Sequence, residues 1–100
     1  MMLHNYFVYI VTNKNKTTLY VGMTNNIQKR TGQHYFDSIH FKKSFAGKYN
    51  CYFLIYYEAF DIPSEAIRRE KQIKKYRREK KDELINSFNP NRNFLNWDVF

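Results

Sequence analysis

Two tyrosines near the start of the chain are the first candidates for chemistry. Tyr9 and Tyr20 lie in residues 6–12 and 17–23, which are rich in β-branched and aromatic side chains and are separated by polar residues 13–16. This pattern predicts a β-hairpin whose four-residue loop sets Tyr9 directly opposite Tyr20. Directly opposed side chains of antiparallel strands point to one face, so two phenols should be neighbours. The structural alternative is an aromatic cross-strand pair that only packs.

Gly22 adds a bare position to that face. It follows Tyr20 by two residues, and alternate residues of a strand point to the same side of a sheet. A glycine inside a strand permits another group to approach the backbone closely. The hairpin is therefore expected to present two hydroxyl groups beside a position that has no side chain.

A helix that Asn25 or Asn26 can cap carries the next two candidates. Arg30 and His34 have the spacing that places them on one helical face with Ile27. If Ile27 packs on the sheet, Arg30 and His34 face inward or lie at the edge of that interface. A guanidinium is costly there unless it meets an anion, so the pattern predicts anion binding. The alternative is an exposed helix face on which only Ile27 touches the sheet.

Glu70 is a carboxylate beside the apolar stripe of an otherwise basic helix. It lies between Ala66 and Ile73 at helical spacing, so all three are expected on one side of that helix. A hard divalent cation prefers such an oxygen ligand, which makes Glu70 a candidate metal ligand. The structural alternative is a simple ion pair with Lys74, four residues further along the helix.

The positive charge of the chain is concentrated in one region. The formal net charge is +8, and nine of the fourteen residues from Arg68 to Lys81 are Lys or Arg. Such a run favours the phosphate backbone of a nucleic acid, whose binding then weakens steeply with salt. A solvated helix is the alternative, and a membrane-surface helix is disfavoured by the weak apolar face. The candidate nucleic-acid contacts are Lys29, Arg68, Arg69, Lys71, Lys74, Lys75, Arg77 and Arg78.

Length and cysteine usage exclude several classes of protein. One hundred residues are expected to form a single domain spanning residues 1–100. A lone Cys51 cannot form an internal disulfide, lies in no Cys/His zinc pattern, and is expected to be a buried, inert thiol. The apolar run at residues 6–11 is too short to span a bilayer, and no signal-peptide pattern is present. Cytoplasmic residence is the resulting expectation.

The later elements must hold these groups in place. Residues 51–58 form a nearly unbroken apolar run, which is typical of a central strand. Two helices should follow, the first from Asp61–Ser64 to about Tyr76 and the second as far as Ser87, where Asn89–Pro90 ends it. The order β-β-α-β-α-α predicts an α/β (α+β) domain with a three-stranded, mostly antiparallel sheet flanked by helices.

Two stretches are left without a regular element. Residues 37–50 are expected to be irregular. The end of the chain carries Phe94, Leu95, Trp97 and Phe100, which could fold back onto the core.

The same segments match a known family in order and spacing. The tripeptides Val8-Tyr9-Ile10 and Tyr20-Val21-Gly22, with ten residues between the two tyrosines, resemble the paired motifs of the GIY-YIG nucleases. Residues 24–30 look like that family's first helix, residues 66–75 like the helix with its metal-binding Glu, and Asn89–Pro90 like a late Asn-Pro element. The resemblance covers nearly the whole chain and is greatest to small single-domain bacterial members related to the nuclease domain of the UvrC repair enzyme.

The chain departs from the family pattern at two positions. The first motif has Val8 where the family name has Gly, a common variation. Some relatives carry Lys after the second motif, whereas this chain has Met23. Either an assisting cation is absent, or Lys29 supplies it.

The resemblance implies a metal-dependent endonuclease that hydrolyses phosphodiester bonds in DNA, with little sequence specificity. Tyr9 would act as the general base or orient the water, and Tyr20 would bind the nucleophile or the phosphate. Arg30 would stabilise the transition-state charge, and His34 would assist proton transfer or bind phosphate. Glu70 would hold one Mg²⁺ or Mn²⁺ ion. As a base at neutral pH, Tyr9 would need its pKa lowered by nearby positive charge.

Two other classes of function remain open from the sequence. One is a non-catalytic nucleic-acid-binding module on a nuclease fold, and the other is an adaptor that docks on acidic partners. Glu70 separates the first from an enzyme, because a pure binder gains nothing from a carboxylate facing phosphate. A response to added divalent metal would separate an enzyme from the adaptor, which should show none. RNA as a partner is not excluded, no membrane or small-molecule cofactor is expected, and the oligomeric state is left open.

Overall fold

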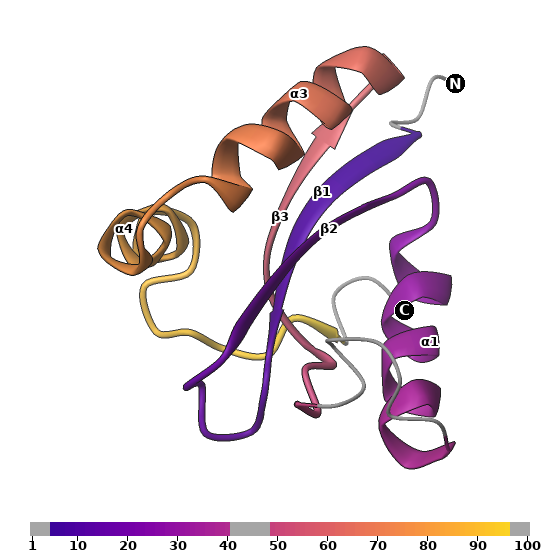
Figure 1. The fold of residues 1–100 in the computed structure, drawn as a ribbon, viewed down its shortest axis with the longest axis vertical. Coiled ribbons are helices and arrows are strands. Elements are labelled where there is room, and N and C mark those ends of the chain that lie inside the picture. Colours follow the sequence, from indigo (N-terminus) through magenta and orange to yellow (C-terminus); the bar gives the residue numbers. More distant parts are fainter. Residues whose placement is uncertain (1–4, 41–48, 97–100) are drawn as a thin grey trace.

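The fold is a three-stranded antiparallel sheet between helices (Figure 1). The computed structural model describes residues 5–40 and 49–96. Its elements, in chain order, are β1 (Tyr6–Thr12), β2 (Leu19–Thr24), α1 (Ile27–His40), β3 (Phe53–Phe60), α3 (Pro63–Lys74) and α4 (Arg78–Phe88). This is the predicted order β-β-α-β-α-α, so the predicted fold class is confirmed.

The sequence predicted that the third strand is central, and this prediction is wrong. The strand order is β2-β1-β3, so β1 lies in the middle and β3 at an edge. The apolar run of β3 has another cause, because helices cover both faces of the sheet. Leu54 is buried on one face, whereas Ile55 and Tyr56 belong to the core on the other. A strand buried on both faces lacks polar alternation, whatever its place in the sheet.

Alternation along β1 decides which side chains meet which helices. Val8 and Ile10 join the core cluster that contains residues of α3 and α4, such as Ala66. Tyr9 points to the opposite face and packs in the cluster that contains Ile27 of α1. Figure 1 shows α1 on one side of the sheet and α3 and α4 on the other. The candidate phenol therefore faces α1.

The hairpin has a longer loop than the sequence predicted, and its register differs. Tyr9 pairs with Gly22, and Val11 pairs with Tyr20, so Tyr9 is not directly opposite Tyr20. The loop covers residues 13–18 rather than 13–16, which slides β2 by two positions. A slip of two residues keeps every side chain on its face, whereas a slip of one would reverse it. Tyr9 and Tyr20 therefore share a face as diagonal neighbours.

The Asn13 side chain sets the longer loop. Its Oδ1 accepts hydrogen bonds from the backbone N–H groups of Thr17 at 2.8 Å and Thr18 at 3.1 Å. Lys16 adopts a left-handed conformation with φ of 60°. Thr12 Oγ1 donates to the Thr18 carbonyl at 2.7 Å. These local bonds leave no periodic signal in the sequence, which explains the missed register.

Helix α1 begins as predicted and ends later. Asn26 Oδ1 accepts a hydrogen bond from Lys29 N–H at 3.0 Å, the bond of an N-cap residue. The helix continues to His40, so residues 37–40 are helical although the sequence analysis left them irregular. No proline interrupts this stretch. Residues 41–48 of the same predicted irregular stretch lie outside the described residues.

Asn89 forms the turn that follows α4. The side chain is 6% exposed, and its Nδ2 donates to the carbonyls of Ile55 at 3.0 Å and Asn93 at 2.8 Å. The helix stops at Phe88, as Asn89–Pro90 predicted. One buried amide therefore ties the end of α4 to β3.

The segment after this turn returns to the sheet. Leu95 N–H donates to the Leu54 carbonyl at 2.7 Å. Phe94 and Leu95 pack against the two core clusters, as expected of a tail that folds back. Trp97 and Phe100, which were expected to do the same, lie outside the described residues.

Cys51 matches the inert thiol expected from the sequence. It is fully buried, and burial raises the pKa of its thiol to about 11, so the thiol is protonated at neutral pH. Within residues 5–40 and 49–96, no helix has the length and hydropathy needed to cross a membrane.

Gly22 and Gly32 should respond to alanine in opposite ways. A Cβ at Gly22 would overlap the buried ring of Tyr9, whereas one at Gly32 meets no heavy atom of residues 5–40 and 49–96 within 4 Å. Gly22→Ala is expected to lower the free energy of unfolding by about 1–3 kcal/mol through overpacking. Gly32→Ala should raise it by about 0.5–1 kcal/mol, because alanine favours a helix interior. Urea denaturation measures both, and equal shifts in the two variants would contradict the packing of Tyr9 on Gly22.

Candidate active site

The hydroxyl of Tyr9 is bonded to two side chains from α1. Tyr9 Oη lies 2.8 Å from His34 Nε2 and accepts a hydrogen bond from Arg30 Nε at 3.3 Å. Tyr9 and His34 have no exposed surface, whereas Arg30 is partly exposed. The predicted inward face of this helix therefore exists, with Ile27 buried on the same side. The bare position at Gly22 does admit a close group, which is the ring of Tyr9 itself.

Tyr20 completes the polar cluster on this face. Its ring centroid lies 5.4 Å from that of His34 and 6.5 Å from that of Tyr9. It is partly exposed and hydrogen-bonded to Arg30. Burial opposes the charge on Arg30, but its bonds and charge interactions with Tyr9 and Tyr20 outweigh this and raise its pKa. The guanidinium is thus held between two phenol oxygens, with part of its surface open to solvent.

Burial fixes the protonation states of the two hidden groups. It raises the pKa of Tyr9 to about 12, and the lowering effect of Arg30 does not overcome it. Burial, followed by the charge of Arg30, lowers the pKa of His34 to about 4. At neutral pH Tyr9 is therefore protonated and His34 neutral. The lowered pKa that a tyrosine base needs is not found here, because burial outweighs the nearby guanidinium.

His34 has one hydrogen-bonded nitrogen and one without a partner. Among the described residues, Nδ1 is a buried atom that makes no hydrogen bond. A charged imidazolium has two N–H donors, so one of them would be unsatisfied in this position. This is a second reason, besides burial of the charge, for the imidazole to remain neutral.

Glu70 belongs to a helix on the other side of the sheet from α1. It lies on α3, and its side chain is 20% exposed rather than open to solvent. Its charge adds to the rise in the pKa of Tyr9, so the carboxylate acts on that hydroxyl electrostatically. The alternative ion pair is present as well, with Lys74 Nζ 3.3 Å from Glu70 Oε2. Because Lys74 is about half exposed, this pair is weak and can exchange with solvent ions.

A polar cleft opens beside Arg30. Its volume is about 210 Å³, and its walls come from the β2–α1 turn and the first turns of α1: Thr24, Asn25, Asn26, Lys29, Arg30 and Gln33. Lys29 therefore lies on the wall of the same cleft as Arg30. The sequence predicted no functional role for Thr24 or Gln33. Gln33 follows Arg30 by three residues, and that helical spacing could have indicated it.

Three of the eight predicted nucleic-acid contacts are engaged within the protein. Arg69 donates to Glu58 from Nε at 3.1 Å and from Nη2 at 2.9 Å. Arg78 donates to the Thr17 carbonyl at 2.8 Å and so holds α4 against the hairpin loop. The third is Lys74, which pairs with Glu70. Positive charge in the sequence does not distinguish these roles from phosphate binding.

The other basic residues of this region form a surface. Arg68, Lys71 and Lys75 line one shallow depression of about 550 Å³ on α3 and its C-terminal end, together with Gln72 and Tyr76. Arg77 is also exposed and precedes α4. We call Arg68, Lys71 and Lys75 the basic surface.

Buried neutral His34 should make folding sensitive to acid. An unfolded histidine has a pKa of about 6.5, so between that pH and pH 4 the unfolded chain binds a proton that folded His34 does not. This contribution is fully present above pH 6.5 and is lost as pH falls towards 4, at a total of about 3 kcal/mol. Denaturation of the natural chain and of His34→Gln at several pH values tests this. An NMR pKa for His34 near 6.5 would contradict it.

Known proteins are similar to this chain in sequence and in fold. The family model described as the GIY-YIG catalytic domain matches residues 5–83, which contain all five candidate catalytic residues. A UPF0213 protein of Natronomonas pharaonis is 33% identical over 84 residues, covering 84% of this chain and 94% of that protein. A UPF0213 protein of Staphylococcus saprophyticus is 34% identical over 87 residues, covering 83% and 96%. The solution NMR structure of a Bacillus halodurans UPF0213 protein matches with a TM-score of 0.54 at 26% identity, covering 86% of this chain and 87% of that one. The chain belongs to the GIY-YIG catalytic domain family.

Proposed function

We propose that this chain is a divalent-metal-dependent endonuclease that hydrolyses phosphodiester bonds in DNA. One observation supports this most directly, the cluster around the Tyr9 hydroxyl. Arg30 and His34 bond to that oxygen, and Glu70 reaches it electrostatically from another helix. Three helical side chains of different chemistry thus act on one phenol, in a family of catalytic domains.

Arg30 and Tyr20 are the groups that would meet the substrate first. Both are partly exposed, whereas Tyr9 and His34 are not. The guanidinium of Arg30 would bind the scissile phosphate and stabilise the charge that grows on its oxygens. Tyr20 would hydrogen-bond the attacking water or a phosphate oxygen. Water would enter by the polar cleft that Arg30 lines.

Tyr9 and His34 would carry the proton behind these groups. The attacking water would give a proton to Tyr9 Oη, while the phenol passes its own proton to His34 Nε2 across the 2.8 Å bond. This exchange leaves the phenol neutral and forms an imidazolium, so Tyr9 never has to exist as a phenolate at neutral pH. His34 is neutral at neutral pH, so its Nε2 lone pair can accept this proton, and burial makes the resulting imidazolium a strong acid that gives the proton up again.

Glu70 fits a divalent ion that shares its ligands with the substrate. No group of three or more metal-ligating side chains exists in the described part of the chain, so a closed protein cage is not available there. Mg²⁺ suits one or two carboxylates together with waters and phosphate oxygens. Glu70 would hold Mg²⁺ or Mn²⁺ in this way, and the bound ion supplies a Lewis acid beside the phosphate.

The DNA would lie across the basic groups that remain exposed. The polar cleft holds Lys29, and the basic surface holds Arg68, Lys71 and Lys75. Contacts of this kind bind phosphates and carry no base information, so we expect little sequence specificity and a preference set by nucleic-acid shape. RNA offers the same phosphates and is the substrate to compare with DNA.

A second candidate is a nucleic-acid-binding module that does not cut. Two features favour it: Tyr9 is wholly buried with a pKa raised to about 12, and Glu70 is paired with Lys74. This candidate keeps the basic surface and gives Glu70 a purely structural partner. It predicts salt-sensitive binding without any response to divalent metal.

Glu70→Gln tests the two candidates against each other. The neutral amide removes the metal ligand, so the single-turnover cleavage rate should fall about a hundredfold or more with Mg²⁺ or Mn²⁺. DNA binding in EDTA should be equal or tighter, since a negative charge is lost near the phosphate. The matched control is Glu65→Gln on the exposed first turn of α3, which should cleave as the natural chain does.

The substrate panel for this test contains nicked, branched, single-stranded and duplex DNA and a matched RNA. Cleavage unchanged by Glu70→Gln would remove the metal role of Glu70. Binding without cleavage of any substrate by the natural chain would favour the second candidate.

A further inference from the structure

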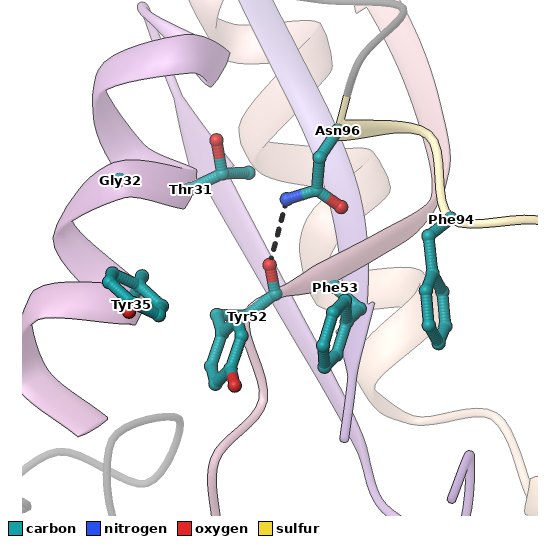
Figure 2. A pocket seen from close by; sticks show the side chains of 7 residues that line it. All are labelled: Thr31, Gly32, Tyr35, Tyr52, Phe53, Phe94 and Asn96. Atoms are coloured by element: carbon teal, nitrogen blue, oxygen red, sulfur yellow. Dashed lines mark hydrogen bonds between the residues drawn. The ribbon is translucent and has the colours of Figure 1, made fainter. Parts of the chain in front are cut away.

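A second concave site lies on the far side of α1 from the polar cleft residues, at the start of β3. It has a volume of about 340 Å³. Figure 2 shows four aromatic rings across it, Tyr35 from α1, Tyr52 and Phe53 at the start of β3, and Phe94 from the returning segment. We call these four side chains the aromatic pocket. None of them has a role in the proposed cleavage.

The rings form a continuous row of contacts. Tyr35 meets Tyr52 edge-on, with centroids 5.0 Å apart and an interplanar angle of 82°. Tyr52 lies 4.5 Å from Phe53, and Phe53 is stacked on Phe94 at 4.2 Å with an angle of 21°. Rings that hold one another need little reordering when a flat ligand enters, so the site is preorganised for stacking.

Asn96 places a fixed amide in the same pocket. Its Oδ1 accepts from Leu54 N–H at 2.9 Å, and its Nδ2 donates to the Tyr52 carbonyl at 3.0 Å, as Figure 2 shows for the second bond. An amide has two N–H donors and two acceptor lone pairs, and these two bonds use one of each. These two bonds fix the orientation of the Asn96 amide. One N–H donor and one acceptor site are left for the polar edge of a ligand ring.

Gly32 borders this pocket without a structural reason among the described residues. It lies inside α1, where glycine is less stable than alanine, and a Cβ there would meet no heavy atom within 4 Å. Within the described ranges, no neighbouring protein atom therefore excludes a larger residue. Gly32 thus lines the pocket without contributing a side chain to it.

Positive charge flanks the aromatic walls. The ammonium of Lys16 lies 5.2 Å from the centroid of the Phe94 ring, which forms one of these walls. Aromatic rings beside cations are the combination with which proteins bind single-stranded nucleic acid, by stacking the bases and neutralising the backbone. The volume is at the small end of the range for ligand sites, about 300–1,000 Å³.

We propose that the aromatic pocket takes an unstacked base from a single-stranded part of the nucleic acid that is bound at the proposed active site. This inference rests on the proposed function and narrows its substrate class to nucleic acids with an unpaired segment, such as flaps, forks or nicked ends. The base would stack along the ring row and present its polar edge to Asn96. The adjoining phosphates would lie towards Lys16.

Binding in EDTA tests this without cleavage. Tyr35→Ala removes a wall ring that is 50% exposed, and Gly32→Leu fills the rim with a good helix former. Each should weaken binding of a fluorescent single-stranded oligonucleotide by about fivefold or more and leave duplex of the same length within twofold. Phe36→Ala is the matched control, because Phe36 is a 46% exposed aromatic on the same helix outside the pocket.

The proposal is overturned if Gly32→Leu and Tyr35→Ala leave the affinity for the single-stranded oligonucleotide unchanged. It is equally overturned if they weaken single-strand and duplex binding alike. Because the assay contains no metal, these outcomes are separate from failure of the proposed cleavage, which Glu70→Gln reports. A natural chain that cleaves flapped and intact duplex equally well, with unchanged rates in both pocket variants, would also contradict the pocket's role.

Discussion

The packing of the Tyr9 ring on Gly22 is the constraint on which the rest of the site depends. It turns the hydroxyl towards α1, where Arg30 donates to it at 3.3 Å and His34 Nε2 lies at 2.8 Å. A larger residue at position 22 would displace the ring and break both contacts. Burial at the same spot keeps the phenol protonated and the imidazole neutral. The site thus consists of a protonated Tyr9 hydrogen-bonded to a neutral His34, behind the partly exposed guanidinium of Arg30. It does not contain a preformed phenolate.

Some of the basic residues make hydrogen bonds within the fold, and others remain on the surface. Arg69 is bonded to Glu58, and Arg78 holds the hairpin loop through a backbone carbonyl. Both fix α3 and α4 to the sheet, and thereby fix where Glu70 lies. The groups left on the outside, such as Lys71 and Lys75, can bind phosphate. On the proposed function, a helix that is anchored in the fold and also binds DNA needs more cations than either task requires alone.

The sequence predicted the element order and the shared face of the two tyrosines, because strand and helix periodicities are regular signals. It did not predict the register of the hairpin, since one side chain, Asn13, sets the loop length through local bonds. It misplaced β3, because burial on both faces looks the same at a centre and at an edge. The internal partner of Arg69 and the amide of Asn96 were also missed. Both depend on contacts between residues far apart in the sequence, which no spacing rule records.

The proposed function requires that Tyr9, Arg30 and Glu70 serve one phosphate and one metal ion. Paramagnetic broadening by Mn²⁺ tests it most directly, with the amide spectrum recorded in the presence of a non-cleavable phosphorothioate oligonucleotide. Broadening should centre on Glu70 and extend to Gly22 and Arg30, and it should be lost in Glu70→Gln. Broadening centred instead on the acidic residues of α4, and unchanged in that variant, would contradict it.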